Sequence, residues 1–272
     1  MKTRILIAAI FVPLIFVTLF FLPPYAVTIL VTIITVVASF ELVRAVGAST
    51  VRRLYVYAGI AAAIIPVAVL FGTGSIFFRV LLYTVIVVLF ADAVITSTSA
   101  HRIALSHIAA VLFGGVVIPY FLSAIISLKL FENGRFYVLV PFLVAFITDG
   151  GAYFTGVFFG KHKAFPSVSP KKTVEGCIGG ILTGVAALVL FGAIVGLSQG
   201  IAVRFWALIL YGLGGGVVTE LGDLAFSLIK REFSVKDYSN LIPGHGGMLD
   251  RFDSMIFAAP AVFMLAKLFP AF

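Results

Sequence analysis

Long apolar runs follow one another through the 272-residue chain and limit what it can fold into. A helix needs roughly 20 residues, with about 17 as the lower limit, to cross the hydrocarbon core of a bilayer. Backbone groups in lipid must bond within their own segment, so these runs are expected to be helices, and the alternation typical of a membrane barrel is absent. The runs that we interpret as spanning helices are Ile5–Phe21, Tyr25–Phe40, Tyr55–Phe71, Val80–Ile95, Ile103–Leu128, Phe136–Phe159, Ile178–Leu197, Phe205–Ile229 and Met255–Phe269. The sequence predicts an all-α, polytopic membrane protein with about nine transmembrane helices.

Composition supports this class. The chain is 62% hydrophobic and 11% charged, whereas an average soluble domain is about 45–50% apolar and about 25% charged. The first apolar run is too long for a signal peptide and has no small-residue cleavage site after it, so we interpret it as a retained first helix.

The net charge of +8 would suggest nucleic acid in a soluble protein. In a membrane protein, Lys and Arg concentrate in cytoplasmic loops. With nine spans and the N-terminus inside, most of the 19 Lys and Arg residues fall on the cytoplasmic side. We therefore predict a cytoplasmic N-terminus, a multi-pass location in the cell (inner or plasma) membrane, and no nucleic-acid partner.

The cysteine and histidine residues argue against an internal disulfide and against a zinc site. Cys177 is the single cysteine, so no internal disulfide can form. The four histidines show no HxxxH or HExxH spacing, which argues against zinc.

The two halves of the sequence differ in character. Residues 1–135 are apolar helices with scattered polar residues, and we interpret them as a scaffold that leaves a homodimer contact open. Residues 136–272 carry polar residues in blocks: TDGGAYFTGVFFGKHK (148–163), SPKKTVEG (169–176), TELGDLAFSLIKREFSVKD (219–237) and PGHGGMLDRFDS (243–254). On the predicted topology these blocks lie at the cytoplasmic face, so we predict that this half carries the catalytic site.

One helix face gathers charged groups in the eighth run. At 100° per residue, Glu220, Asp223, Ser227 and Lys230 lie within about 80° of one another. A structural ion pair with a neighbouring helix would also place a carboxylate here. Two carboxylates three residues apart repel each other unless a cation lies between them, which favours metal binding, with Asp223 as the first ligand.

The other blocks offer further polar groups. Asp149 in the sixth run is not explained by the small residues that follow it, and we expect it to line a polar site. The adjacent lysines Lys171 and Lys172 have three possible roles: they set the membrane topology, bind anionic lipid or bind a phosphate.

In the last block, Gly246 and Gly247 let the backbone approach a ligand. Three charged residues follow there: Asp250 and Asp253 share a helix face, and Arg251 offers a bidentate phosphate contact.

Carboxylates and cations both become necessary if Mg²⁺ bridges the carboxylates to a polyphosphate. A nucleoside triphosphate at the cytoplasmic face is the ligand that this charge pattern favours. No GxxxxGK[ST] occurs, so a P-loop is excluded.

These residues resemble the signature of the phosphatidate cytidylyltransferase (CDP-diacylglycerol synthase) family. The resemblance covers roughly the C-terminal half and rests on Ser227-x-x-Lys230-Arg231, Lys236-Asp237 and Pro243-x-His245-Gly246-Gly247-x-x-Asp250-Arg251-x-Asp253, together with SPKKTVEG and the Asp149–Gly160 stretch. Gly150 departs from the pattern, where threonine is expected after the aspartate.

The resemblance implies that CMP passes from CTP to phosphatidic acid, which gives CDP-diacylglycerol and pyrophosphate with the help of Mg²⁺. It leaves open a second metal ion or a monovalent cation. It implies metal ligation by Asp223 and Asp250, with Glu220 and Asp253 in support. Asp149 is expected to be a substrate-binding residue that is also held in reserve for the metal. The remaining expected site residues bind or orient phosphates: Lys171, Lys172, Arg251, Ser227, Lys230, Arg231, His245, Gly246 and Gly247.

Two alternatives remain from the sequence. A lipid or polyprenol kinase that uses CTP shares the substrates but transfers the γ-phosphate. An ion or phosphate transporter would use Asp92, Asp149 and Asp223 along a transport pathway. Transporters often contain inverted repeats, and we see no such repeat in this sequence.

Overall fold

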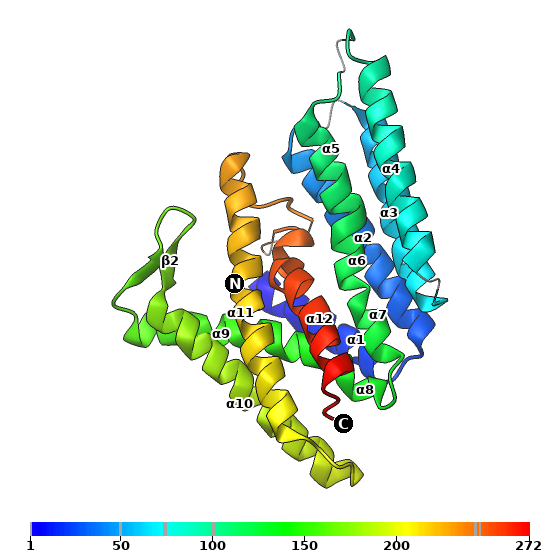
Figure 1. Ribbon diagram of the computed structural model, residues 1–272. Helices are drawn as coiled ribbons and strands as arrows, with labels where there is room; N and C mark the ends of the chain where they lie inside the picture. Colours follow the sequence, from blue (N-terminus) through cyan, green and yellow to red (C-terminus); the bar gives the residue numbers. More distant parts are fainter. Residues whose placement is uncertain (1, 49–50, 73–74, 100–101, 242–243, 245) are drawn as a thin grey trace. The chain divides into compact units, whose positions relative to one another are not determined.

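The computed structural model describes residues 2–48, 51–72, 75–99, 102–241, 244 and 246–272 and shows a chain built from helices (Figure 1). Each predicted apolar run is largely helical, so the all-α class is confirmed. The helices are α1 (Lys2–Phe20), α2 (Pro24–Ala45), α3 (Arg52–Leu70), α4 (Ser75–Ile95), α5 (Leu105–Leu112), η2 (Phe113–Val117), α6 (Ile118–Leu122), α7 (Ala124–Lys129), α8 (Gly134–Tyr137), α9 (Val140–Phe159), α10 (Val174–Gln199), α11 (Phe205–Glu232) and α12 (Leu249–Leu268). The strands are β1 (Lys163–Phe165) and β2 (Ser169–Thr173).

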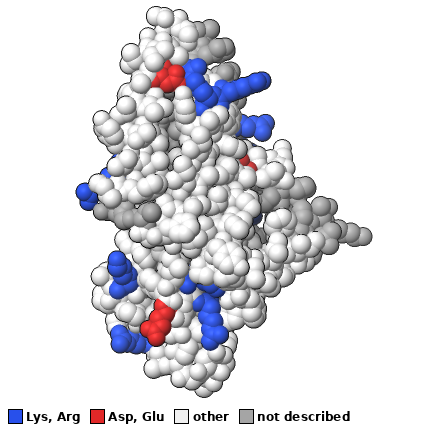
Figure 2. All heavy atoms as spheres, turned by 90° about the vertical axis from the view of Figure 1, so that its right-hand side faces the viewer, with Lys and Arg blue, Asp and Glu red and all other residues white. Residues whose placement is uncertain are grey.

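Seven helical segments within the described ranges are long and apolar enough to cross a membrane. α1 adds a shorter apolar segment, Ala9–Phe20, and α12 is not among the seven. Asp250, Arg251 and Asp253 in the first turns of α12 lower its apolar character. The face in Figure 2 carries few charged side chains over most of its area, as lipid-facing surface requires. The chain is a multi-pass membrane protein, while the count of nine spans and the orientation stay predictions.

The chain forms two compact units. Unit 1 comprises Met1–Leu14, Leu22–Ser127 and Glu232–Arg251, and unit 2 comprises Ile15–Phe21, Leu128–Arg231 and Phe252–Phe272.

In unit 1, α2 and α3 pack against the run from α5 to α6. A single helix was predicted for this run, and the π-helical turn η2 interrupts it at a close approach: a Cβ on Gly115 would lie 2.8 Å from the Cα of Ala58. A short π segment inside an α-helix is a local adjustment that often accompanies such constraints. The buried core of this unit is formed by Val43, Ala48, Val51, Leu54, Ala58, Leu89, Ile103, Ile108 and Val111.

In unit 2, α9 and α10 lie side by side and meet through small residues (Figure 1). A Cβ on Gly180 would lie 2.6 Å from the carbonyl oxygen of Thr148 and 2.8 Å from the Cβ of Ala152. Close backbone approach of this kind is how membrane helices associate without a hydrophobic driving force between them. It fixes the register of α9 against α10, and α9 carries Asp149. The buried core of unit 2 is formed by Leu128, Tyr137, Val140, Val144, Leu188, Ala207, Leu208, Tyr211, Val262, Ala266 and Ala271.

Gly180→Ala is expected to destabilise the protein by about 1–3 kcal/mol, since the added methyl group overpacks a backbone contact. Gly150→Ala is the matched control, because nothing lies within 4 Å of the Cβ that it adds. That change is expected to be neutral or to stabilise by up to about 1 kcal/mol, as alanine favours a helix interior. Denaturation curves of the two variants in the same detergent check the difference, and equal stabilities would contradict the packing described here.

Candidate active site

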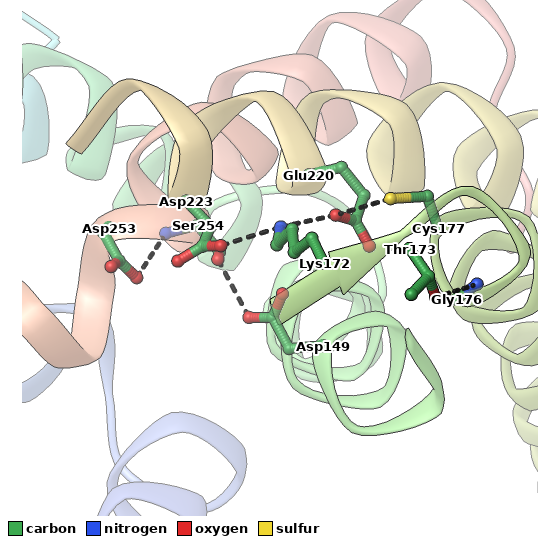
Figure 3. A network of polar contacts seen from close by, with 9 residues as sticks. All are labelled: Asp149, Lys172, Thr173, Gly176, Cys177, Glu220, Asp223, Asp253 and Ser254. Carbon is green, nitrogen blue, oxygen red and sulfur yellow. Dashed lines mark hydrogen bonds and ion pairs between the residues drawn. The ribbon is translucent and has the colours of Figure 1, made fainter. Parts of the chain in front are cut away.

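Two carboxylates of α11 share one cation in unit 2. Glu220 and Asp223 lie nearly one turn apart on this helix, and the Nζ atom of Lys172 lies between their carboxylates (Figure 3). Lys172 Nζ is 2.5 Å from Glu220 Oε2 and 2.7 Å from Asp223 Oδ2. The group between the two carboxylates of this helix face is thus an ammonium, which makes an ion pair with each of them, and metal binding at this face stays a prediction.

These charges are mostly withdrawn from solvent. The side chain of Glu220 is 8% exposed, that of Lys172 17% and that of Asp223 28%. Burial lowers the pKa of the Lys172 ammonium, but the carboxylates of Asp223 and Glu220 more than offset this, so its pKa lies above the usual value. Lys172 is consequently charged throughout the neutral pH range. Asp223 is the more accessible of the two acids to a ligand.

A short β-hairpin brings Lys172 to the acids. Strands β1 and β2 pair antiparallel, with Lys163 opposite Thr173 and Phe165 opposite Ser169. Successive side chains of a strand point to opposite faces, which separates half-buried Lys172 from exposed Lys171. Pro170 lies inside β2.

The hairpin is joined firmly to the start of α10. Thr173 is the N-cap residue, and its hydroxyl oxygen accepts a hydrogen bond from the Gly176 amide at 3.1 Å. Glu175 Oε2 accepts from the amides of Lys161 and His162 at 3.1 and 3.2 Å, so both ends of the hairpin are tied to the same helical turn.

Further acids reach the same region from α9 and α12. The Ser254 hydroxyl donates to Asp149 Oδ2 at 2.8 Å, and the Ser254 amide donates to Asp253 Oδ1 at 2.8 Å. Figure 3 shows Asp149 pointing toward Asp223 and Lys172, while Asp253 lies on the far side of Ser254. Four of the predicted polar residues, Asp149, Lys172, Glu220 and Asp223, are thus brought together within unit 2.

The donor atoms of this cluster fit a hard divalent cation. Glu220 Oε1 is buried and accepts no hydrogen bond from the described part of the chain, which is unusual for a carboxylate oxygen. Carboxylate oxygens are the ligands that Mg²⁺ prefers in proteins. Over the same described part, no three Asp, Glu, His or Cys side chains stand close enough to hold a metal ion as they are placed. Lys172 occupies the place between Glu220 and Asp223, so a metal ion at these oxygens would have to compete with the ammonium group.

Asp250 lies in unit 1, at the start of α12. Its Oδ2 atom accepts hydrogen bonds from the amides of Tyr238 and Gly247, at 2.8 and 3.0 Å. Gly246 has a φ of +84°, a backbone conformation that glycine adopts without strain. The Gly247 amide that was predicted to face a phosphate therefore has an acceptor within its own loop, and joint metal ligation by Asp223 and Asp250 stays a prediction.

A family model described as "Cytidylyltransferase family" matches residues 2–269. The chain belongs to the cytidylyltransferase family. It is 42% identical to the phosphatidate cytidylyltransferase of Bacillus subtilis strain 168 over 160 residues, which is 59% of this chain and 57% of that protein. It is also 42% identical to the protein of the same name from Staphylococcus epidermidis strain RP62A over 134 residues, 49% of this chain and 50% of that protein. The matched segment spans about half the length of these curated relatives.

The remaining predicted site residues lie as follows. Ser227 and Lys230 are half-buried on α11, and Lys171 and Arg251 are exposed. Arg231 is exposed, and its Nε atom donates to the Val168 carbonyl at 3.5 Å. His245 lies outside the described residues.

Three polar residues of the described chain were not predicted from the sequence. Ser254 bridges Asp149 to α12, and the Cys177 thiol donates to Glu220 Oε2 at 3.6 Å. The third, Glu41, is buried in unit 1. A lone carboxylate at the end of an apolar run was the one signal in the sequence that pointed to Glu41. Ser254 and Cys177 carried no comparable signal.

Proposed function

We propose that this chain is a phosphatidate cytidylyltransferase, which transfers CMP from CTP to phosphatidic acid and releases pyrophosphate. The observation that carries the proposal is the buried Glu220–Lys172–Asp223 cluster in a chain that belongs to the cytidylyltransferase family. The names of the relatives from Bacillus and Staphylococcus support the choice of lipid substrate.

The reaction needs little acid–base chemistry. A phosphomonoester has its second pKa near ~6, so phosphatidate is largely dianionic at neutral pH and its oxygen is already a nucleophile. This oxygen attacks the α-phosphorus of CTP, the bond from the α-phosphorus to the oxygen that bridges the β-phosphorus breaks, and pyrophosphate leaves with that electron pair. Catalysis is then mostly positioning of the two substrates and neutralisation of charge.

Lys172 has the central role in this proposal. Before ligands bind, its ammonium group compensates Glu220 and Asp223 and holds their carboxylates at one place. With substrate present it donates to a phosphate oxygen and frees carboxylate oxygens. Glu220, Asp223 and Asp149 would hold Mg²⁺, with Asp250 and Asp253 in support. When bound, Mg²⁺ would offset charge on the polyphosphate and on the leaving pyrophosphate. Residues proposed to bind or orient phosphates are Lys171, Ser227, Lys230, Arg231, His245, Gly246, Gly247 and Arg251.

The acyl chains of the lipid substrate remain in the bilayer in this proposal, and only the head group enters the site. Transfer is proposed to take place at the cytoplasmic face of the cell membrane, where CTP is available.

Pyrophosphate release by the purified protein tests this function and its metal requirement. Release is expected only when CTP, phosphatidic acid and Mg²⁺ are all present. Addition of excess EDTA should reduce the rate to background, and excess Mg²⁺ should restore it, because carboxylates alone repel the triphosphate. An unchanged rate in EDTA would contradict the proposed role of the acids, and release without phosphatidic acid would contradict the proposed acceptor.

A further inference from the structure

Glu41 is a buried carboxylate that no part of the proposed mechanism uses. It lies one turn from the end of α2, and the residue is only 5% exposed. A charged side chain in an apolar helix is costly, and such residues usually mark a specific partner. Its partners come from a segment of unit 1 about 200 positions further along the chain.

The two oxygens of Glu41 accept three hydrogen bonds from this segment. The Ser239 hydroxyl donates to Oε1 at 2.5 Å and the Met248 amide donates to Oε1 at 2.9 Å. The Leu249 amide donates to Oε2 at 2.7 Å. Leu249 is the first residue of α12, so a negative charge lies at the N-terminus of that helix, where its dipole favours one.

The glycine before Met248 lies directly against the same carboxylate. A Cβ on Gly247 would be 2.6 Å from each oxygen of Glu41, so a side chain at this position would require the carboxylate or the backbone to move. The Gly247 amide donates to Asp250, so three successive amides, those of Gly247, Met248 and Leu249, all donate to carboxylates. The loop conformation is therefore set by two acids, one from α12 itself and one from α2.

We propose that Glu41 is a positioning residue: its carboxylate holds the Gly247–Leu249 backbone in the conformation that presents Asp250 and Arg251. The importance of those two residues for transfer rests on the proposed function. The contacts of Glu41 do not, since they join residues of the chain itself. The proposal also explains why residue 247 is a glycine: the absence of a side chain leaves space for the Glu41 carboxylate.

Amide hydrogen exchange on the ligand-free protein tests the contact itself. Glu41→Gln keeps the shape of the side chain but replaces one accepting oxygen by an NH₂ group, which cannot accept from an amide. Exchange at Met248 and Leu249 is expected to become at least tenfold faster, while exchange in α9 and α10 stays the same. Glu132→Gln is the matched control, because Glu132 is exposed in unit 2. Unchanged exchange at Met248 and Leu249 would overturn the proposal, whatever the activity of the protein.

Kinetics then separate positioning from general stability. In Glu41→Gln, kcat for CMP transfer is expected to fall at least tenfold with little change in the KM for phosphatidic acid or in the denaturation temperature. Glu41→Asp keeps the charge with a shorter reach and should recover part of the loss. Loss of activity in proportion to loss of folded protein would contradict a positioning role. If wild-type protein shows no transfer, the proposed function fails and the exchange result still decides the role of Glu41.

Gly247→Ala tests the same contact by a change in the loop. It replaces the first test if Glu41→Gln does not fold. The added methyl group forces the Glu41 carboxylate and the Gly247–Leu249 backbone apart, whichever of the two moves. The same increase in exchange at Met248 and Leu249 is expected. An alanine variant with wild-type exchange would show that the contact does not hold the loop.

Discussion

Asp223→Asn is expected to reduce CMP transfer by at least about 10²-fold, the scale on which removal of one fixed charge acts at a reacting centre. The asparagine keeps the size and one oxygen of the side chain but removes the negative charge. It thereby removes the partner of Lys172 Nζ, now at 2.7 Å, and the most exposed acid of the cluster. The measurement is the transfer rate at saturating CTP, phosphatidic acid and Mg²⁺.

The loss in Asp223→Asn should come without unfolding, because Lys172 keeps its contact with Glu220. Glu232→Gln is the matched control: it removes a carboxylate from the exposed end of the same helix and is expected to leave the rate unchanged. A rate in Asp223→Asn within a few-fold of wild type would remove Asp223 from the proposed chemistry.

Lys172→Met is the second change with a large expected effect, again a loss of at least about 10²-fold. Methionine fills a similar volume but leaves Glu220 and Asp223 facing each other with no cation between them, and like charges so close repel strongly. The substitution also removes a donor for phosphate. Initial rates with varied CTP check this expectation, and they should show the loss in kcat.

Two other lysines of the hairpin serve as control positions for Lys172→Met. Lys163→Met changes an exposed lysine on β1 and is expected to leave the rate unchanged. Lys171→Met changes the neighbouring lysine, whose side chain is exposed, and is expected to cause a smaller loss than Lys172→Met. Equal losses at positions 171 and 172 would show that total positive charge, rather than the Lys172 contact, matters.

The helices and the acid face of α11 were predictable from the sequence, because both depend on local periodicity. Hydrophobic runs of membrane length have few alternatives to a helix, and residues 220 and 223 share a face of any helix that contains them. Asp149 was also predictable, since a carboxylate in an apolar run is costly without a polar partner.

The contacts that complete the cluster were not predictable. Lys171 and Lys172 are chemically identical in the sequence, and only the pairing of β1 with β2 decides that Lys172 reaches the acids. Nothing in the sequence distinguishes Ser254 from other serines, because its contact with Asp149 depends on how α9 and α12 pack. Glu41 lies about 200 residues from its partners, and no local pattern links such positions.

The fate of the phosphorus atoms of CTP tests the central claim most directly. Purified protein is given CTP labelled with ³²P at either the α- or the γ-position, together with phosphatidic acid and Mg²⁺, and the lipid phase is then extracted. A cytidylyltransferase leaves the α-label in the lipid and the γ-label in water-soluble pyrophosphate, which is the result predicted here. Appearance of the γ-label in the lipid would contradict the account and identify a kinase.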